Sequence, residues 1–159
     1  MTNLATHPEA ILRHSEALPF VSFGEGNSLQ LLQVDLAAGV WTVRAQFSAG
    51  LTVQTHRHTG AVHAFTNAGS WHYLEYPNDI NLPGSYLFEP AGSVHTLHVP
   101  ASNTEITDIW FIINGANLNL DTDGNIVSVS DAHSVLARYR AACAEQHGLA
   151  DPPVVVFGG

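Results

Sequence analysis

Three histidines are spaced so that their imidazoles could act together. His56 and His58 are separated by one residue, and His95 follows the turn-like segment Glu89-Pro90-Ala91-Gly92-Ser93-Val94. Side chains at positions i and i+2 of an extended strand lie on one face, so the first two imidazoles would point at one spot. Three imidazoles that converge inside a β-structure form a metal site with positions open for water or substrate. In a chain with ten histidines the spacing can also be coincidence, and the surrounding elements must decide.

The chain from Leu18 onward has the pattern of an all-β domain. About ten short runs rich in Val, Leu, Phe, Trp and Thr are separated by turn-forming residues at intervals of about 8 to 12 positions, which favours a β-sandwich or small barrel over βαβ units. Asp123-Gly124 supplies the positive φ that a tight hairpin turn needs. We therefore expect Leu118–Leu120 and Ile126–Val129 to pair as a hairpin.

One helix is expected near the C-terminal end, over about 131–147. Ser130-Asp131 can cap it, apolar residues from Ala132 to Cys143 recur every three to four positions, and Gly148 stands where a C-cap glycine would end it. The sequence thus predicts one domain over 1–159, with a β-barrel at about 18–130 followed by this helix.

The composition of the chain restricts the classes of binding partner that we expect. The net charge is −9 with only five Lys and Arg, so we expect neither nucleic acid nor an anionic membrane surface as a partner. The single cysteine, Cys143, excludes an intramolecular disulfide. No run approaches the roughly 18 apolar residues that span a bilayer, and the N-terminal residues lack a signal-peptide pattern. These features predict a soluble, cytoplasmic protein.

Glycines and a proline around the histidines favour the metal site over coincidence. One half comprises Gly50, His56, His58 and Gly69, and the other comprises Gly84, Pro90, Gly92 and His95. This arrangement resembles the two conserved motifs of the cupin superfamily. Within the superfamily, the stretches His56–Ala64, Gly69–Tyr76 and Gly84–Leu97 are similar to the 2,4'-dihydroxyacetophenone dioxygenase group and the ChrR-like cupins, with the acetylacetone-cleaving diketone dioxygenase as wider kin. The resemblance runs from about Leu18 to Leu149.

The resemblance implies a cupin fold, a jelly-roll-like double-stranded β-helix, with the three histidines as ligands of Fe(II), or of Zn(II), Ni(II) or another divalent metal. The family's usual glutamate ligand, expected at Val62 or His63, is missing, and Val99 replaces the closing asparagine. A three-histidine site is therefore implied, with Glu75 as a fourth ligand or acid/base. Glu89 would hydrogen-bond a ligand imidazole or a metal-bound water. The resemblance also implies a homo-oligomer, a dimer or tetramer.

The implied function is a non-haem metal-dependent dioxygenase of aromatic degradation. It would use O2 to cleave a C–C bond of an α-hydroxyketone or β-dicarbonyl compound, for instance 2,4'-dihydroxyacetophenone. His63, Phe65, Trp71 and Tyr73 are candidates to line the substrate cavity, although most strand aromatics fill the interior of a small barrel. Two alternatives use the same histidines: a metal-binding sensor that switches a partner without turnover, and another cupin enzyme, an isomerase or lyase.

Overall fold

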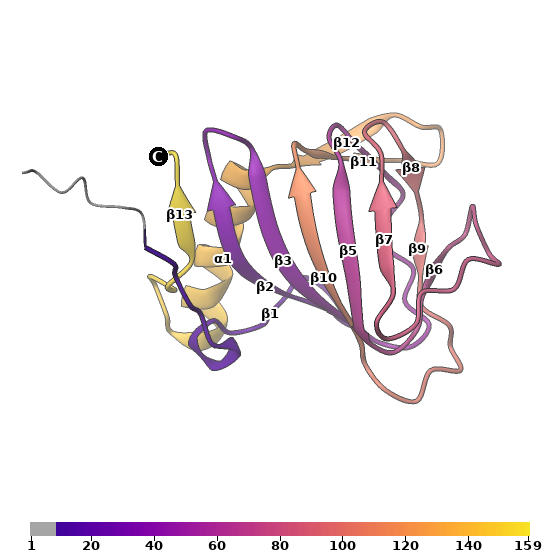
Figure 1. Ribbon diagram of the computed structural model, residues 1–159, viewed down its shortest axis with the longest axis horizontal. Coiled ribbons are helices and arrows are strands. Elements are labelled where there is room, and N and C mark those ends of the chain that lie inside the picture. The colour runs from indigo at the N-terminus through magenta and orange to yellow at the C-terminus, as the bar shows by residue number, and fades with distance from the viewer. Residues whose placement is uncertain (1–8) are drawn as a thin grey trace, which may run out of the picture.

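The computed structural model describes residues 9–159, which form two facing layers of β-strands and one long helix (Figure 1). This confirms the predicted all-β class with a C-terminal helix. The larger sheet has the order β1 (Val21–Ser22), β2 (Asn27–Asp35), β3 (Val40–Phe47), β10 (Thr107–Asn114), β5 (Val62–Ala68) and β7 (Tyr86–Glu89), and β13 (Val155–Phe157) pairs in parallel with β2.

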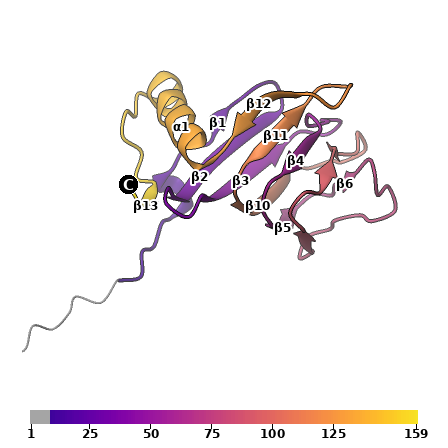
Figure 2. The same ribbon diagram turned by 90° about the horizontal axis from the view of Figure 1, so that it is seen from above.

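The smaller sheet carries all three of the predicted histidines. Its strand order is β12 (Ile126–Ser130), β11 (Asn117–Leu120), β4 (His56–His58) and β8 (Val94–His95), while β6 (His72–Tyr73) and β9 (Leu97–His98) form a separate pair. Seen from above, the smaller sheet lies across one face of the larger sheet (Figure 2). β11 and β12 form the predicted hairpin, with Gly124 at φ 85°.

Alternation of buried and exposed residues decides which face of each strand points between the layers. Every second residue of β3, from Trp41 to Phe47, is buried, and β5 buries Val62, Ala64 and Thr66 in the same way. Because side chains alternate across a strand, the intervening residues of β5, including His63 and Phe65, face outward. The interior is therefore apolar, and the site must be built from the few polar side chains that enter it.

The helix α1 (Ala132–His147) closes one end of the fold behind β2 (Figure 1). Asp131 caps it, since its carboxylate accepts a hydrogen bond from the Ser134 backbone N–H at 2.8 Å and the Ser134 hydroxyl accepts one from the Asp131 N–H. Gly148 ends it in the left-handed conformation. One face of the helix packs on the sheet, where the hydroxyl of the buried Tyr139 donates to the Pro19 carbonyl at 2.6 Å.

A short 3-10 helix, η1 (Ser15–Ala17), precedes the strands. Within residues 9–159, no helix combines the length and the apolar character that a bilayer crossing requires.

Candidate metal centre

Strand pairing brings the three predicted histidines into one region. β4 runs antiparallel to β8 and β11, so that His56 lies opposite His95 and His58 lies opposite Asn117. Opposite residues of an antiparallel pair project from the same face of a sheet. The Nε2 atoms of His56 and His58 are 3.0 Å apart, and the rings of His58 and His95 have centroids 6.5 Å apart. His56 and His58 thus lie together as their spacing predicts, whereas within residues 9–159 His95 does not complete a three-histidine group.

The turn of the second motif holds the first motif in place. The N–H of Gly92 donates to the His58 carbonyl at 2.7 Å, and the His58 N–H donates to the Ser93 carbonyl at 3.2 Å. The turn itself is closed on the Pro90 carbonyl, which accepts hydrogen bonds from the Ser93 N–H and hydroxyl. Gly92 adopts φ 85°, a left-handed conformation that favours glycine. The two halves of the motif thus meet through backbone hydrogen bonds at His58.

The hydrogen bonding of His56 defines its tautomer. Its Nδ1 lies 3.0 Å from the Gln54 carbonyl, which can only accept, so Nδ1 carries the proton. In the neutral ring Nε2 then carries the lone pair, which faces Nε2 of His58 3.0 Å away. Burial lowers the pKa of His56, against the raising effect of the Gln54 carbonyl, and burial likewise lowers the pKa of His95. Both imidazoles are therefore neutral near pH 7, which is the state that binds metals.

Glu89 brings a carboxylate into the cluster from the neighbouring sheet. It is 1% exposed, and its Oε2 lies 3.0 Å from Nε2 of His58. In the pairing of β5 with β7 it stands opposite Val62, one of the positions at which the resemblance places the missing glutamate. Side chains of such a pair share a face. A buried carboxylate thus enters the interior beside the position of the absent family ligand.

The carboxylate of Glu75 is hydrogen-bonded to Thr96. Its carboxylate accepts hydrogen bonds from the Thr96 N–H at 2.9 Å and from the Thr96 hydroxyl at 2.7 Å, and its residue is exposed. Since the Thr96 hydroxyl proton is donated to Glu75, the Thr55 hydroxyl 2.7 Å away must donate to Thr96. Burial alone would raise the pKa of the Glu75 carboxyl, but these hydrogen bonds lower it. Glu75 anchors the backbone beside His95 and does not join the cluster, in contrast to the ligand or acid/base role expected from the sequence.

The donor types in the cluster fit a divalent metal, although the donors do not all converge on one point. Both oxygens of Glu89, both ring nitrogens of His95 and Nδ1 of His58 are buried without a well-formed hydrogen bond. Two ligand atoms bound about 2.1 Å from one metal at right angles lie roughly 3 Å apart, close to the spacing from Nε2 of His58 to His56 and to Glu89. Within residues 9–159, however, no three His, Cys, Asp or Glu side chains converge as a complete metal-binding group.

His95 is the predicted ligand that keeps this metal-binding group incomplete. It stacks on Tyr73, with ring centroids 4.2 Å apart and planes inclined by 15°. Neutral imidazoles with unpaired nitrogens are ligands for Fe(II), Zn(II) or Ni(II), and a buried carboxylate with unpaired oxygens is costly unless it is paired or bound to a cation. The donor types present, three imidazoles and one carboxylate, are therefore types that such metals bind, with His58 lying 3.0 Å from both His56 and Glu89.

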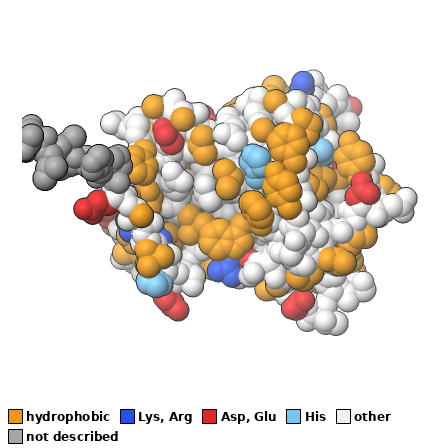
Figure 3. All heavy atoms as spheres, in the orientation of Figure 1, with side chains coloured by type: hydrophobic (Ala, Val, Ile, Leu, Met, Phe, Trp, Pro, Cys, Tyr) orange, Lys and Arg blue, Asp and Glu red, His pale blue; other side chains and the backbone are white. Residues whose placement is uncertain are grey.

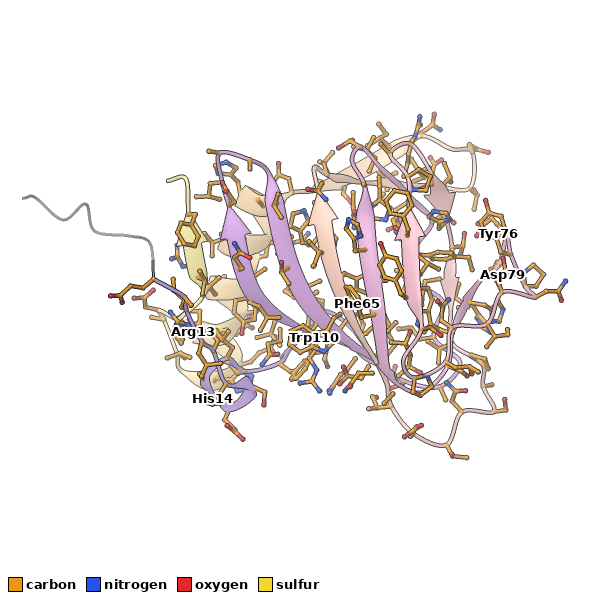
Figure 4. All side chains as sticks on the ribbon, viewed as in Figure 1. Arg13, His14, Phe65, Tyr76, Asp79 and Trp110 are labelled. Atoms are coloured by element: carbon orange, nitrogen blue, oxygen red, sulfur yellow. The ribbon has the colours of Figure 1, made fainter. Side chains whose placement is uncertain are left out.

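A cavity of about 180 Å³ lies between the sheets and reaches His56 and His58. Its wall is otherwise mostly apolar, with Tyr73 at the metal end and two carboxamides, those of Asn27 and Asn117. The sequence did not single out either asparagine, because no motif marks them. A second hollow of about 250 Å³ opens beside Glu89 and His95. Tyr73 borders both hollows, and Tyr76 and Asp79 of the loop after β6 line the outer one (Figure 4).

Three of the four predicted cavity residues lie elsewhere. His63 and Phe65 are on the outer face of β5, where the His63 ring contacts the Tyr86 hydroxyl at 2.7 Å. Phe65 lies on this face with Trp110, its partner on β10 (Figure 4), and hydrophobic side chains gather over β5 and β7 (Figure 3). Trp71 is fully buried, but in the core behind Tyr73, and its indole N–H donates to Thr66. Only Tyr73 lines the cavity, since the sequence shows alternation without showing which face points inward.

Comparisons with known proteins agree with this architecture. The family model described as the ChrR cupin-like domain matches residues 8–116. A protein of unknown function with a cupin-like fold from Ralstonia eutropha is similar at 36% identity and a TM-score of 0.85, over 95% of this chain and 94% of that one. An RmlC-like cupin from the same organism is 24% identical with a TM-score of 0.86, over 95% and 96% of the two chains.

An acetylacetone dioxygenase from Acinetobacter johnsonii shares the fold at 20% identity and a TM-score of 0.74, over 86% of this chain and 94% of that chain. No curated protein matches. These likenesses confirm the predicted cupin fold. With a family model over more than half of its length and a full-length relative above 30% identity, the chain belongs to the ChrR cupin-like family.

Proposed function

We propose that this protein is a non-haem metal-dependent dioxygenase that cleaves a C–C bond of an α-hydroxyketone or a β-dicarbonyl compound. The observation that carries the proposal is the group formed by His56, His58 and Glu89, with His95 opposite His56 on the adjacent strand, beside a largely apolar cavity that His56 and His58 line. The likeness to an acetylacetone dioxygenase supports the reaction class at the level of the fold.

His56, His58 and His95 would hold the metal, with Glu89 as the carboxylate of the centre in place of Glu75. When bound, Fe(II) supplies Lewis acidity toward the carbonyl and the electrons for reaction with O2. Glu89 does not line the cavity, so it would act on the substrate through His58, which lies 3.0 Å from its carboxylate. For an aryl hydroxyketone, the bond between the carbonyl carbon and the hydroxymethyl carbon breaks. Both oxygen atoms of O2 then appear in two carboxylic acids.

The cavity wall would exclude water from this chemistry and orient the substrate. Apolar side chains from both core clusters surround it, and Tyr73 separates it from the outer hollow. The His56 tautomer, held by the Gln54 carbonyl, would keep a lone pair aimed at the metal position without rearrangement. Positioning and exclusion of water are therefore the contributions that this chain itself makes.

Oxygen uptake by the iron-loaded protein, measured with a panel of hydroxyacetophenones and β-diketones, tests the proposal. We expect uptake with at least one compound and its loss in His58→Ala. His133→Ala, which removes an exposed histidine on the helix, is the matched control and should retain activity. A protein that binds one equivalent of metal yet consumes no O2 with any compound would contradict the dioxygenase assignment.

A metal-binding regulatory module is the alternative, and the description of the family model as ChrR cupin-like keeps it in view. Both functions need the same histidines, so the absence of metal would remove both. Stoichiometric metal with no turnover would favour the regulatory role.

A further inference from the structure

The wall of the cavity is electrically neutral. Among its lining residues there is no Lys, Arg, Asp or Glu. The polar groups are the imidazoles of His56 and His58, the Tyr73 hydroxyl, the carboxamides of Asn27 and Asn117, and the Trp41 indole N–H, which donates to the Gly115 carbonyl. The buried Glu89 carboxylate lies 3.0 Å behind His58. With no Lys or Arg in this wall, the only cation that a ligand would meet is a metal held by the histidines, and the remainder of the ligand would contact uncharged side chains.

Asn117 is the carboxamide of this wall that pairs with His58. It is the first residue of β11 and lies directly opposite His58 in the pairing of β11 with β4. Residues opposite each other in an antiparallel pair have Cβ atoms about 4.5–5.5 Å apart on one face. The carboxamide therefore enters the cavity beside the imidazole that stands at the centre of the metal cluster.

The carboxamide oxygen of Asn117 is buried and has no hydrogen-bond partner among the described residues. Other asparagines nearby are satisfied. Asn114 donates to the Ala61 carbonyl at 2.8 Å, and Asn119, two positions further along the same strand, donates to the Ser128 hydroxyl at 2.9 Å. Most buried polar atoms are paired, and an exception in a ligand cavity indicates a group that the ligand completes.

We infer that Asn117 is a ligand-recognition residue, whose carboxamide oxygen accepts a hydrogen bond from a hydroxyl of the molecule that occupies the cavity. The inference rests on the proposed function, because it takes the occupant to be the substrate. It restricts the substrate class to compounds that carry a hydroxyl near the metal. An α-hydroxyketone has such a donor, whereas a β-diketone bound as its enolate has none.

The volume of the cavity limits the size of the remaining, apolar part of the ligand. An apolar cavity of about 150 Å³ holds a benzene molecule, so the roughly 180 Å³ found here accommodates an aromatic ring or an aliphatic chain of similar bulk. Leu29, Val43, Phe47 and Phe111 are among the side chains that would surround it. The preferred ligand is thus a compact hydroxyketone, apolar at one end and hydroxylated at the end nearest His58.

Binding under anaerobic conditions tests this inference without relying on turnover. The dissociation constants of 2-hydroxyacetophenone and of acetophenone, which lacks only the hydroxyl, are measured by calorimetry on the metal-loaded protein. The metal itself favours the hydroxyketone by chelation, so the informative quantity is the change in preference between wild type and Asn117→Leu. We expect the preference to fall roughly 5-fold to 100-fold, the effect of leaving a buried hydroxyl unpaired.

Asn119→Leu is the matched control, since its carboxamide has a protein partner, and it should keep the wild-type preference. Asn117→Val, with a side chain suited to a strand, provides a second apolar variant if the leucine variant does not fold. An unchanged preference in both Asn117 variants would overturn the inference and leave the proposed function intact. A lost preference in an enzyme that consumes no O2 would sustain the recognition role and reject the dioxygenase. Binding of neither ligand to wild type would reject both.

Discussion

Replacing Glu89 by glutamine would show whether this buried carboxylate belongs to the metal centre. The side chain is 1% exposed, and its Oε2 lies 3.0 Å from Nε2 of His58. Glutamine keeps the size of the side chain and removes its negative charge. Without metal, we expect the variant to be at least as stable as wild type, because a buried carboxylate without good hydrogen bonds is costly.

With metal bound, we expect wild type to be more stable than Glu89→Gln. Loss of a residue that contacts a metal or supports its ligands typically weakens metal binding about 10-fold to 100-fold, or about 1.4 to 2.7 kcal/mol. Because a metal that binds only the native state stabilises it, the metal-induced gain in the free energy of unfolding should shrink by that amount. In a domain of this size about 1 kcal/mol corresponds to roughly 2–4 °C, so the metal-induced rise in Tm should be roughly 3–11 °C smaller.

Thermal unfolding with a chelator and with excess Zn(II), which has no redox chemistry, measures both effects, and calorimetric titration gives the metal affinity directly. Glu75→Gln is the control: its carboxylate is exposed and bonded to Thr96, so the metal-induced gain should equal that of wild type. The reasoning is refuted if Glu89→Gln retains the full gain, and most clearly if Glu75→Gln loses it instead.

Three further predictions concern the frame around the site. Gly69 has φ +73°, and an added Cβ would lie 2.4 Å from a threonine hydroxyl on β10, so Gly69→Ala should lower the free energy of unfolding by about 2–4 kcal/mol. Gly84→Ala is the control, with φ +87° but open space around the added Cβ, and should lower it by about 1–2 kcal/mol. Equal losses for the two variants in urea unfolding would argue against the close approach at Gly69. Asp131→Ala should cost about 1 kcal/mol at neutral pH. The helix-cap hydrogen bonds lower the pKa of Asp131 from 3.8, so this contribution should be present above that pH and disappear as the pH falls through the lowered pKa. Asp131→Asn, which caps without titrating, should show no such change in unfolding curves at about pH 7 and about pH 3. Tyr73→Leu should weaken metal binding several-fold by removing the ring stacked on His95, whereas Tyr73→Phe should not; equal weakening in both would assign the effect to the hydroxyl.

Much of the architecture follows from local patterns in the sequence. Short β-branched and aromatic runs between turn residues predicted the all-β class, and the period of three to four residues after Ser130 predicted the helix. These signals are local, because strand alternation, hairpin turns and helix caps depend on neighbours within a few positions. The spacing of His56 and His58 is also local, and the structure places both imidazoles on one face, with His95 opposite His56 on the adjacent strand.

The carboxylate of the site could not be chosen in this way. Glu75 and Glu89 both occupy strand-like segments close to the histidines in sequence, and their environments differ only through pairing. The register of β5 with β7 turns Glu89 inward opposite Val62, while Glu75 is bonded to Thr96 on the outside.

The cavity was likewise decided by tertiary structure. Alternation shows that His63 and Phe65 share a face of β5, but only the stacking of one sheet on the other makes that face the outer one. Asn117 has no motif around it and gains its place beside His58 from the pairing of β11 with β4. The sequence by itself determined which residue types can bind a metal and the fold that carries them. Which carboxylate and which carboxamide stand beside them depended on pairing between distant strands, because hydrogen-bond register across a sheet is a long-range property that no local pattern encodes.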